Sequence, residues 1–150
     1  MTDSVLPIPD DAFVLVVDDN EQNRELVAAY LDELRCEVVT LASGQAALDA
    51  VAERVPDVII LDIMMPAMSG YQVCERLRAH EATASVPIMM LTALNESSDV
   101  ERALEVGATD FLIKPVQRAE LLGRVRAQIA HRRLESRVQA GIADLKSLAG

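Results

Sequence analysis

The sequence predicts an α/β domain built on a doubly wound, five-stranded parallel sheet, and three observations support this prediction. Five short apolar segments have the length of buried strands, and segments with helical spacing of apolar residues alternate with them. The strand segments are apolar throughout, which is typical of parallel sheets covered by helices on both faces. The chain of 150 residues, 51% of them hydrophobic, is long enough to bury one such core.

The strands are recognised by their continuous apolar character and by the polar residues that bound them. They are expected at 13–17, 37–41, 58–61, 88–91 and 110–113. Pro87 stands at the beginning of the fourth strand, where a missing backbone N–H is tolerated.

The helices are recognised by apolar residues that recur on one helical face and by residues suited to helix ends. They are expected at 21–34, 44–55, 70–80, 97–106 and from 117 to at least 129. Ser43 and Ser69 are suited to cap the second and third helices. Gly107 is suited to the left-handed position that often follows a helix, here the fourth.

The two ends of the chain differ in character from the domain at 12–130. Residues 1–11 contain two prolines and three aspartates, which predicts a flexible lead-in. Residues 131–150 predict a helical extension, because five positions follow the 4-3-4-3 spacing of a coiled-coil seam. These positions are Leu134, Val138, Gly141, Leu145 and Leu148.

The extension has two open interpretations. Its seam covers only about two heptads, and Gly141 should weaken a helix by roughly 1 kcal/mol relative to alanine. One interpretation is a frayed amphipathic tail. The other is a coiled-coil linker that dimerises or leads to a further domain, in which case the chain is a fragment of a longer regulator.

Polar residues follow four of the five strands at the edge where parallel strands end. They are Asp18 and Asp19, Asp62, Thr92, and Lys114 with Pro115. In an open α/β sheet, ligands bind just beyond the carboxyl ends of the strands. We therefore interpret these four endings as one site.

The acidic members of this site suit a magnesium ion, which prefers oxygen ligands in octahedral geometry. Asp19 and Asp62 are the best candidates for direct ligands, and Asp18 is expected to act through a water molecule. The backbone carbonyl of Met64 could add another oxygen. Mn²⁺ could substitute, because the same oxygen ligands suit both ions.

The remaining members suit phosphoryl chemistry. Asp62 can act as a nucleophile toward phosphorus and form an aspartyl phosphate. Lys114 offers a compact cation to one phosphoryl oxygen, and the Thr92 hydroxyl can donate a hydrogen bond to another. The Ala93 N–H is a further donor. Taken singly, each residue has a purely structural interpretation, but their joint occurrence at four strand ends favours a site.

With these residues in view, the sequence resembles the receiver domain of bacterial two-component response regulators over about residues 12–130. The matching stretches are Val14 to Asn20, Ile60 to Pro66, Leu91 to Ala93, Gly107 to Ala108 and Phe111 to Val116. The resemblance implies a flavodoxin-like fold with strand order 2-1-3-4-5. It also implies phosphorylation of Asp62 by a histidine kinase or a histidine phosphotransfer protein.

The resemblance further assigns a role to each site residue. Asp18 and Asp19 form the acidic pocket, Thr92 is the switch hydroxyl and Lys114 is the phosphate-contacting lysine. It implies a cis peptide bond between Lys114 and Pro115.

Phe111 falls at the family's aromatic switch position, where it lacks the hydroxyl of a tyrosine. Two interpretations of this residue stay open, an aromatic switch and an ordinary core aromatic. Ser69 replaces an aspartate that is common in the loop, which should change only helix capping.

The expected consequence of phosphorylation is repacking of the surface formed by the fourth helix, the fifth strand and the fifth helix. Output would then pass to a partner protein, to an attached domain, or to a second copy through this face or the C-terminal helix. Such a protein is a phosphoacceptor and not a turnover enzyme.

Three other functions compete with this one. A phosphatase with an aspartyl-phosphate intermediate commonly has a second aspartate two residues after the nucleophile, where this chain has Met64. A phosphate-independent interaction module needs none of the site residues that are present. A nucleotide-binding domain would need a glycine-rich phosphate loop after the first strand, and the sequence has none there.

Composition narrows the partners and the location. The formal net charge of −10 argues against nucleic-acid binding by this segment. No apolar run approaches the roughly 20 residues that span a bilayer, and no secretory signal begins the chain, so a cytoplasmic location is expected. Cys36 and Cys74 lack metal-ligand spacing and are interpreted as reduced thiols.

Overall fold

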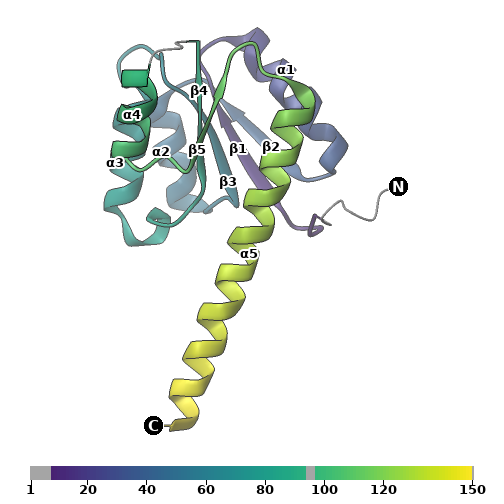
Figure 1. Ribbon diagram of the computed structural model, residues 1–150, viewed down its shortest axis with the longest axis vertical. Helices are drawn as coiled ribbons and strands as arrows, with labels where there is room; N and C mark the ends of the chain where they lie inside the picture. The colour runs from purple at the N-terminus through teal and green to yellow at the C-terminus, as the bar shows by residue number, and fades with distance from the viewer. Residues whose placement is uncertain (1–7, 94–96, 150) are drawn as a thin grey trace.

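The structure, a computed structural model, describes residues 8–93 and 97–149 and contains one parallel sheet (Figure 1). Its strands are β1 (Phe13–Val17), β2 (Glu37–Leu41), β3 (Val58–Asp62), β4 (Ile88–Thr92) and β5 (Asp110–Ile113). Their spatial order is β2-β1-β3-β4-β5, and all four neighbouring pairs are parallel. The doubly wound, flavodoxin-like order predicted from the sequence is therefore confirmed.

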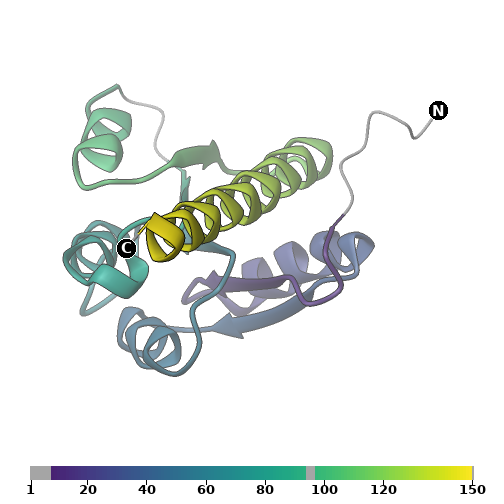
Figure 2. The same ribbon diagram turned by 90° about the horizontal axis from the view of Figure 1, so that it is seen from below.

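Helices cover both faces of this sheet, as Figure 2 shows from below. They are α1 (Glu21–Leu31), α2 (Gly44–Glu53), α3 (Gly70–Ala79), α4 (Ser97–Glu105) and α5 (Arg118–Ala149). Buried residues of α2, α3 and α4 form one hydrophobic cluster with the sheet, and buried residues of α1 and α5 form the other.

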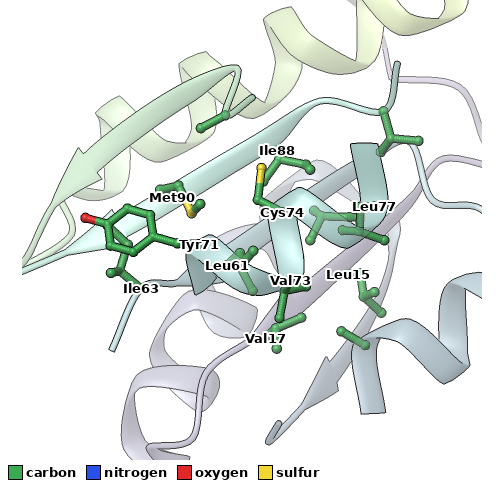
Figure 3. Packing of buried hydrophobic residues seen from close by; sticks show 14 of the residues in the cluster. Leu15, Val17, Leu61, Ile63, Tyr71, Val73, Cys74, Leu77, Ile88 and Met90 are labelled. Carbon is green, nitrogen blue, oxygen red and sulfur yellow. The ribbon is translucent and has the colours of Figure 1, made fainter. Parts of the chain in front are cut away.

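Alternate strand residues supply the two clusters. Leu15 and Val17 of β1 point into the first cluster, while Val14 and Val16 point into the second. Part of the first cluster, with α3 lying across β3 and β4, is drawn in Figure 3. Because helices cover both faces, the three central strands β1, β3 and β4 are buried at every position.

Several helix ends differ by a few residues from the prediction. The sequence predicts a first helix that reaches residue 34, but α1 ends at Leu31 and a 3-10 turn follows over Asp32–Leu34. Arg35 then adopts a left-handed conformation with φ 56°. The sequence predicts a second helix that reaches about residue 55, but Arg54 is already extended with ψ 124°. Pro56 favours this early end, because the residue before a proline, here Val55, avoids helical geometry.

The predicted helix caps are present. Ser43 accepts a hydrogen bond from the Ala46 N–H at 3.1 Å. Ser69 and Gln72 form a reciprocal capping box at the start of α3, so the serine replaces the common aspartate as a cap. Gly107 follows α4 with φ 102°, in the left-handed region that glycine adopts without strain.

The C-terminal extension is the continuation of α5, which runs as one helix past the edge of the sheet (Figure 1). Leu134 and Val138 on the predicted seam are 60% and 54% exposed. The side chains of Leu145 and Leu148, and residues 1–7 of the predicted lead-in, lie outside what the structure describes.

Candidate functional site

The acidic residues predicted to form one site do lie together at the carboxyl edge of the sheet. β1 and β3 are paired neighbours, with Val17 opposite Leu61, so the residues that follow these positions are adjacent in space. Carboxylate oxygens of Asp18, Asp19 and Asp62 lie within 4.8 Å of one another.

These three carboxylates differ in exposure. Asp18 is 1% exposed and Asp62 is 4% exposed, while Asp19 is open to solvent. The donor set consists of oxygens alone, which fits a hard divalent cation such as Mg²⁺. Its open side at Asp19 would leave room for waters or phosphate oxygens.

Lys114 reaches this acidic cluster from the end of β5. Its Nζ lies 3.0 Å from Asp62 Oδ1 and 3.4 Å from Asp18 Oδ2. The backbone holds the lysine in place, because its N–H donates to the Thr92 carbonyl at 2.7 Å. The peptide bond from Lys114 to Pro115 is cis. The structure therefore gathers residues from the carboxyl ends of β1, β3, β4 and β5.

The electrostatics of Asp62 reflect its crowded surroundings. Burial raises the pKa of its carboxyl group, the hydrogen bond and charge of Lys114 lower it, and the charges of Asp18 and Asp19 raise it again. The net direction is upward. Burial by itself lowers the pKa of Lys114, but Asp62 and Asp18 outweigh burial and raise it above the ordinary value.

Thr92 and Ala93 occupy the exit of β4. Thr92 is 2% exposed as the last residue of the strand, and Ala93 directly after it is exposed. Both therefore stand where the chain leaves the sheet beside Asp62, on the way to α4. Met64, two residues after Asp62, has a side chain that is 64% exposed.

Phe111, the residue at the aromatic switch position, lies in β5 opposite Met90. Its ring is partly buried and packs against the first hydrophobic cluster, the one shared with α3 and α4. The residue thus packs on the face of the sheet that α2, α3 and α4 cover, and it is not a member of the acidic cluster.

The first turn of α1 supports the acidic cluster in a way that the sequence analysis did not single out. The Asn20 N–H donates to Asp18 Oδ1 at 2.9 Å, and the Asn20 side chain caps α1 by accepting from the Asn23 N–H. Arg24 Nη1 donates to the Asp18 carbonyl at 2.8 Å. In the sequence, the only indication of this support is that Asn20, a residue type that often caps helices, stands at the start of the first helix.

Gly70 is a second site residue that the sequence analysis used only as a helix start. A Cβ atom on this residue would lie 2.4 Å from the Asp62 carbonyl oxygen and 2.8 Å from the Ile63 Cα. The Gly70 N–H also donates to the Ile63 carbonyl at 2.9 Å. The first turn of α3 therefore rests on the backbone of Asp62, an approach that only glycine permits.

Comparison with known proteins connects this arrangement to a family. The family model of the response regulator receiver domain matches residues 14–126, most of the chain. The chain belongs to the response regulator receiver family. The resemblance read from the strand-end motifs is thereby confirmed.

Among curated relatives, the receiver resembles PleD of Caulobacter vibrioides, a response regulator, with 43% identity over 77% of this chain and 26% of PleD. It also resembles MtrA of Mycobacterium tuberculosis, a DNA-binding response regulator, with 39% identity over 89% of this chain and 57% of MtrA. The chain thus spans about a quarter of PleD and little more than half of MtrA.

Solved structures share the fold. A response regulator described as putative, from Chloroflexus aurantiacus, superposes with a TM-score of 0.77 at 37% identity, over 80% of this chain and 98% of that one. The receiver domain of sensor histidine kinase PA1611 from Pseudomonas aeruginosa has a TM-score of 0.75 at 33% identity, with the same coverages of 80% and 98%. That structure holds a magnesium ion coordinated in its active-site cleft.

Among the described residues, none of the helices combines the length and the apolar character that crossing a bilayer requires.

Proposed function

We propose that this receiver is a Mg²⁺-dependent phosphoryl acceptor whose acceptor group is the Asp62 carboxylate. The observation that carries the proposal is the position of Asp62, between a pair of acidic neighbours and the Lys114 ammonium. A carboxylate that is 4% exposed beside two others needs cations to balance its charge, and a phosphoryl group brings further negative charge to the same place.

In the proposed step, an Asp62 oxygen forms a bond to phosphorus while the bond from phosphorus to a histidine nitrogen of the donor breaks. The electron pair of that bond stays with the departing imidazole. A bound Mg²⁺, held by Asp19 and Asp62, by Asp18 through water and by the Met64 carbonyl, would neutralise charge on the phosphoryl oxygens. In this step the phosphoryl group ends on the receiver's own side chain and is not passed to a separate substrate, so the proposed role is that of a phosphoacceptor and not of a turnover enzyme.

Other site residues of this chain would contact the phosphoryl group once it is bound to Asp62. Lys114 already lies 3.0 Å from Asp62 and needs little movement to contact a phosphoryl oxygen. The Thr92 hydroxyl and the Ala93 N–H would donate hydrogen bonds to further oxygens. Movement of Thr92 toward Asp62 would then pull on the connection to α4.

Output would leave through the surface formed by α4, β5 and α5. Support comes from Leu104 of α4 and Ile113 of β5, which are 52% and 42% exposed on it. Phe111 beneath this surface would move with it. A partner protein, an attached output domain or a second copy could bind there, and the α5 extension is proposed as the linker. We propose a cytoplasmic location, where a histidine kinase or phosphotransfer protein would supply the phosphoryl group.

The test is the mass of the intact protein after incubation with acetyl phosphate and Mg²⁺. One added phosphoryl group is expected on the wild type, and none on Asp62→Asn or on the wild type without a divalent cation. Mn²⁺ should restore the adduct. An unmodified wild-type protein that also fails to respond to beryllofluoride would contradict the proposal and favour a phosphate-independent interaction module.

A further inference from the structure

Tyr71 connects the backbone beside Asp62 to α4. It is the second residue of α3, directly after Gly70, which rests on the Asp62 carbonyl. Its side chain is 6% exposed, and Figure 3 shows the ring next to Ile63 and Met90 with the hydroxyl pointing away from them. Because α3 lies so close to Asp62, the Tyr71 ring is held relative to the phosphoacceptor.

The far end of Tyr71 contacts α4 at two points. Its hydroxyl donates to the Asp99 carbonyl at 3.2 Å, and the Arg102 guanidinium lies 4.3 Å from the ring centroid. Asp99 and Arg102 are three residues apart and therefore share one face of α4. A buried ring with a hydrogen bond and a cation over its face positions the first turns of the helix.

No other aromatic hydroxyl of the chain is placed to do this. The sequence contains two tyrosines, and the second, Tyr30, lies on α1 and packs against the opposite face of the sheet. Phe111, which packs against the same cluster as Tyr71, has no hydroxyl to donate.

We propose that Tyr71 is a positioning residue that couples Asp62 to α4, with its hydrogen bond to Asp99 holding α4 in the unphosphorylated arrangement. The inference rests on the function proposed above. When Thr92 moves toward a phosphorylated Asp62, the start of α4 moves with the chain that follows Thr92. Tyr71 stays with the backbone of Asp62, so α4 moves relative to Tyr71. This movement breaks or lengthens the hydrogen bond between Tyr71 and Asp99.

A hydrogen bond made in only one arrangement biases the equilibrium between the two. The net contribution of a neutral hydrogen bond corresponds to about a 2- to 10-fold change in such an equilibrium. Removing the Tyr71 hydroxyl should therefore raise the population of the other arrangement, the one that a phosphorylated Asp62 favours, by about 2- to 10-fold.

The experiment compares Tyr71→Phe with the wild type and uses Tyr30→Phe as the matched control. Tyr71→Phe keeps the ring and the Arg102 contact and removes only the hydroxyl. Its rate of phosphorylation by acetyl phosphate with Mg²⁺ should rise about 2- to 10-fold. Amide hydrogen exchange in α4 of the unphosphorylated protein should rise as well. Tyr30→Phe should match the wild type in both measurements.

A spectroscopic measurement separates coupling from a merely structural role. The chain has no tryptophan, so in Tyr30→Phe the only tyrosine emission comes from Tyr71. Addition of beryllofluoride and Mg²⁺ should change this emission, and the change should be absent when Asp62→Asn is added. A stability loss alone, measured by urea unfolding, would not produce this pattern.

The outcomes are distinguishable. Equal phosphorylation rates for Tyr71→Phe and the wild type, with no response of Tyr71 emission to beryllofluoride, would overturn the role of Tyr71 and leave Asp62 as the acceptor. A wild-type protein that takes up no phosphoryl group would overturn both proposals.

Discussion

Asp62 carries an electrostatic cost in the unphosphorylated protein. Burial and the neighbouring carboxylates raise its pKa despite the opposing effect of Lys114. Between its unfolded and folded pKa values, the folded state therefore binds more protons than the unfolded state. Stability contributed by this residue falls as pH rises through that interval and stays low above it.

Replacing this carboxylate by an amide should relieve the cost. We expect Asp62→Asn to raise the free energy of unfolding at neutral pH, by on the order of 1 kcal/mol. The gain should shrink as the pH falls through the interval in which the wild-type Asp62 takes up its proton. Urea unfolding in the absence of divalent cations, at several pH values, measures the difference.

The control for this prediction is Asp10→Asn, which makes the same chemical change at an exposed position before β1. It should leave stability nearly unchanged at every pH. A gain for Asp62→Asn that persists unchanged into acid would show that the cause is not the charge of Asp62.

At the scale of elements, the approach of α3 to the phosphoacceptor depends on one glycine. Gly70→Ala would place its Cβ 2.4 Å from the Asp62 carbonyl oxygen, which is backbone and has little freedom to move. We expect a loss of about 1–3 kcal/mol in unfolding free energy, the usual range for an overpacked site. We also expect slower phosphorylation, because the Asp62 backbone must shift.

The matched control is Gly123→Ala in α5, where a Cβ would meet nothing within 4 Å. Alanine is the better helix former by roughly 1 kcal/mol, so this variant should be as stable as the wild type or more so. Thermal unfolding of both variants measures the contrast. Equal stability of the two would mean that α3 can withdraw from Asp62 at no cost.

At the scale of the whole molecule, α5 is fastened to the base of the sheet, opposite the acidic site. Arg133 makes a two-pronged ion pair with Asp57, at 2.6 and 3.0 Å, and a further contact with Asp11 at 3.0 Å. Asp57 also accepts the Phe13 N–H at 2.9 Å. The pKa of Arg133 is raised, first by its hydrogen bond to Asp57. One ion pair thus links the first residues of the proposed linker to the starts of β1 and β3.

Removal of this guanidinium should leave the largely buried Asp57 without its cation. We expect Arg133→Met to lower the free energy of unfolding by about 2–3 kcal/mol. Chemical denaturation measures the loss, and Arg137→Met, at an exposed position one turn further along α5, is the control. Similar values for the two variants would mean that the ion pair does not hold α5 to the sheet.

The exposed apolar positions of the extension predict weak self-association. Leu134 and Val138 are four residues apart on α5 and so lie on one face of a helix that leaves the sheet. The double variant Leu134→Glu, Val138→Glu should weaken any dimer at least about tenfold, because charges would enter the seam. Light scattering across a concentration series measures this effect. Ser136→Glu adds a charge away from the seam, and equal masses for this control and the double variant would exclude the seam as an interface.

Local patterns in the sequence were sufficient for the sheet and for the grouping of the acidic cluster with Lys114. The apolar period identifies each strand, the polar residue after it marks the edge, and parallel pairing brings these edges together. Residues such as Asp18, Asp62 and Lys114 were accessible to this reasoning because each lies directly at a strand end. The helix ends at 34 and 55 were not, because short-range preferences at a helix terminus are nearly balanced.

The amino-acid order alone therefore established the fold class, the strand order through the family resemblance, and the residues gathered at the carboxyl edge. The contacts of Gly70 with Asp62, of Tyr71 with Asp99 and of Arg133 with Asp57 became visible only in three dimensions. The last two join residues 28 and 76 positions apart in the chain. They depend on the angle and distance at which each helix packs on the sheet, and these are properties of the whole core that no local pattern encodes.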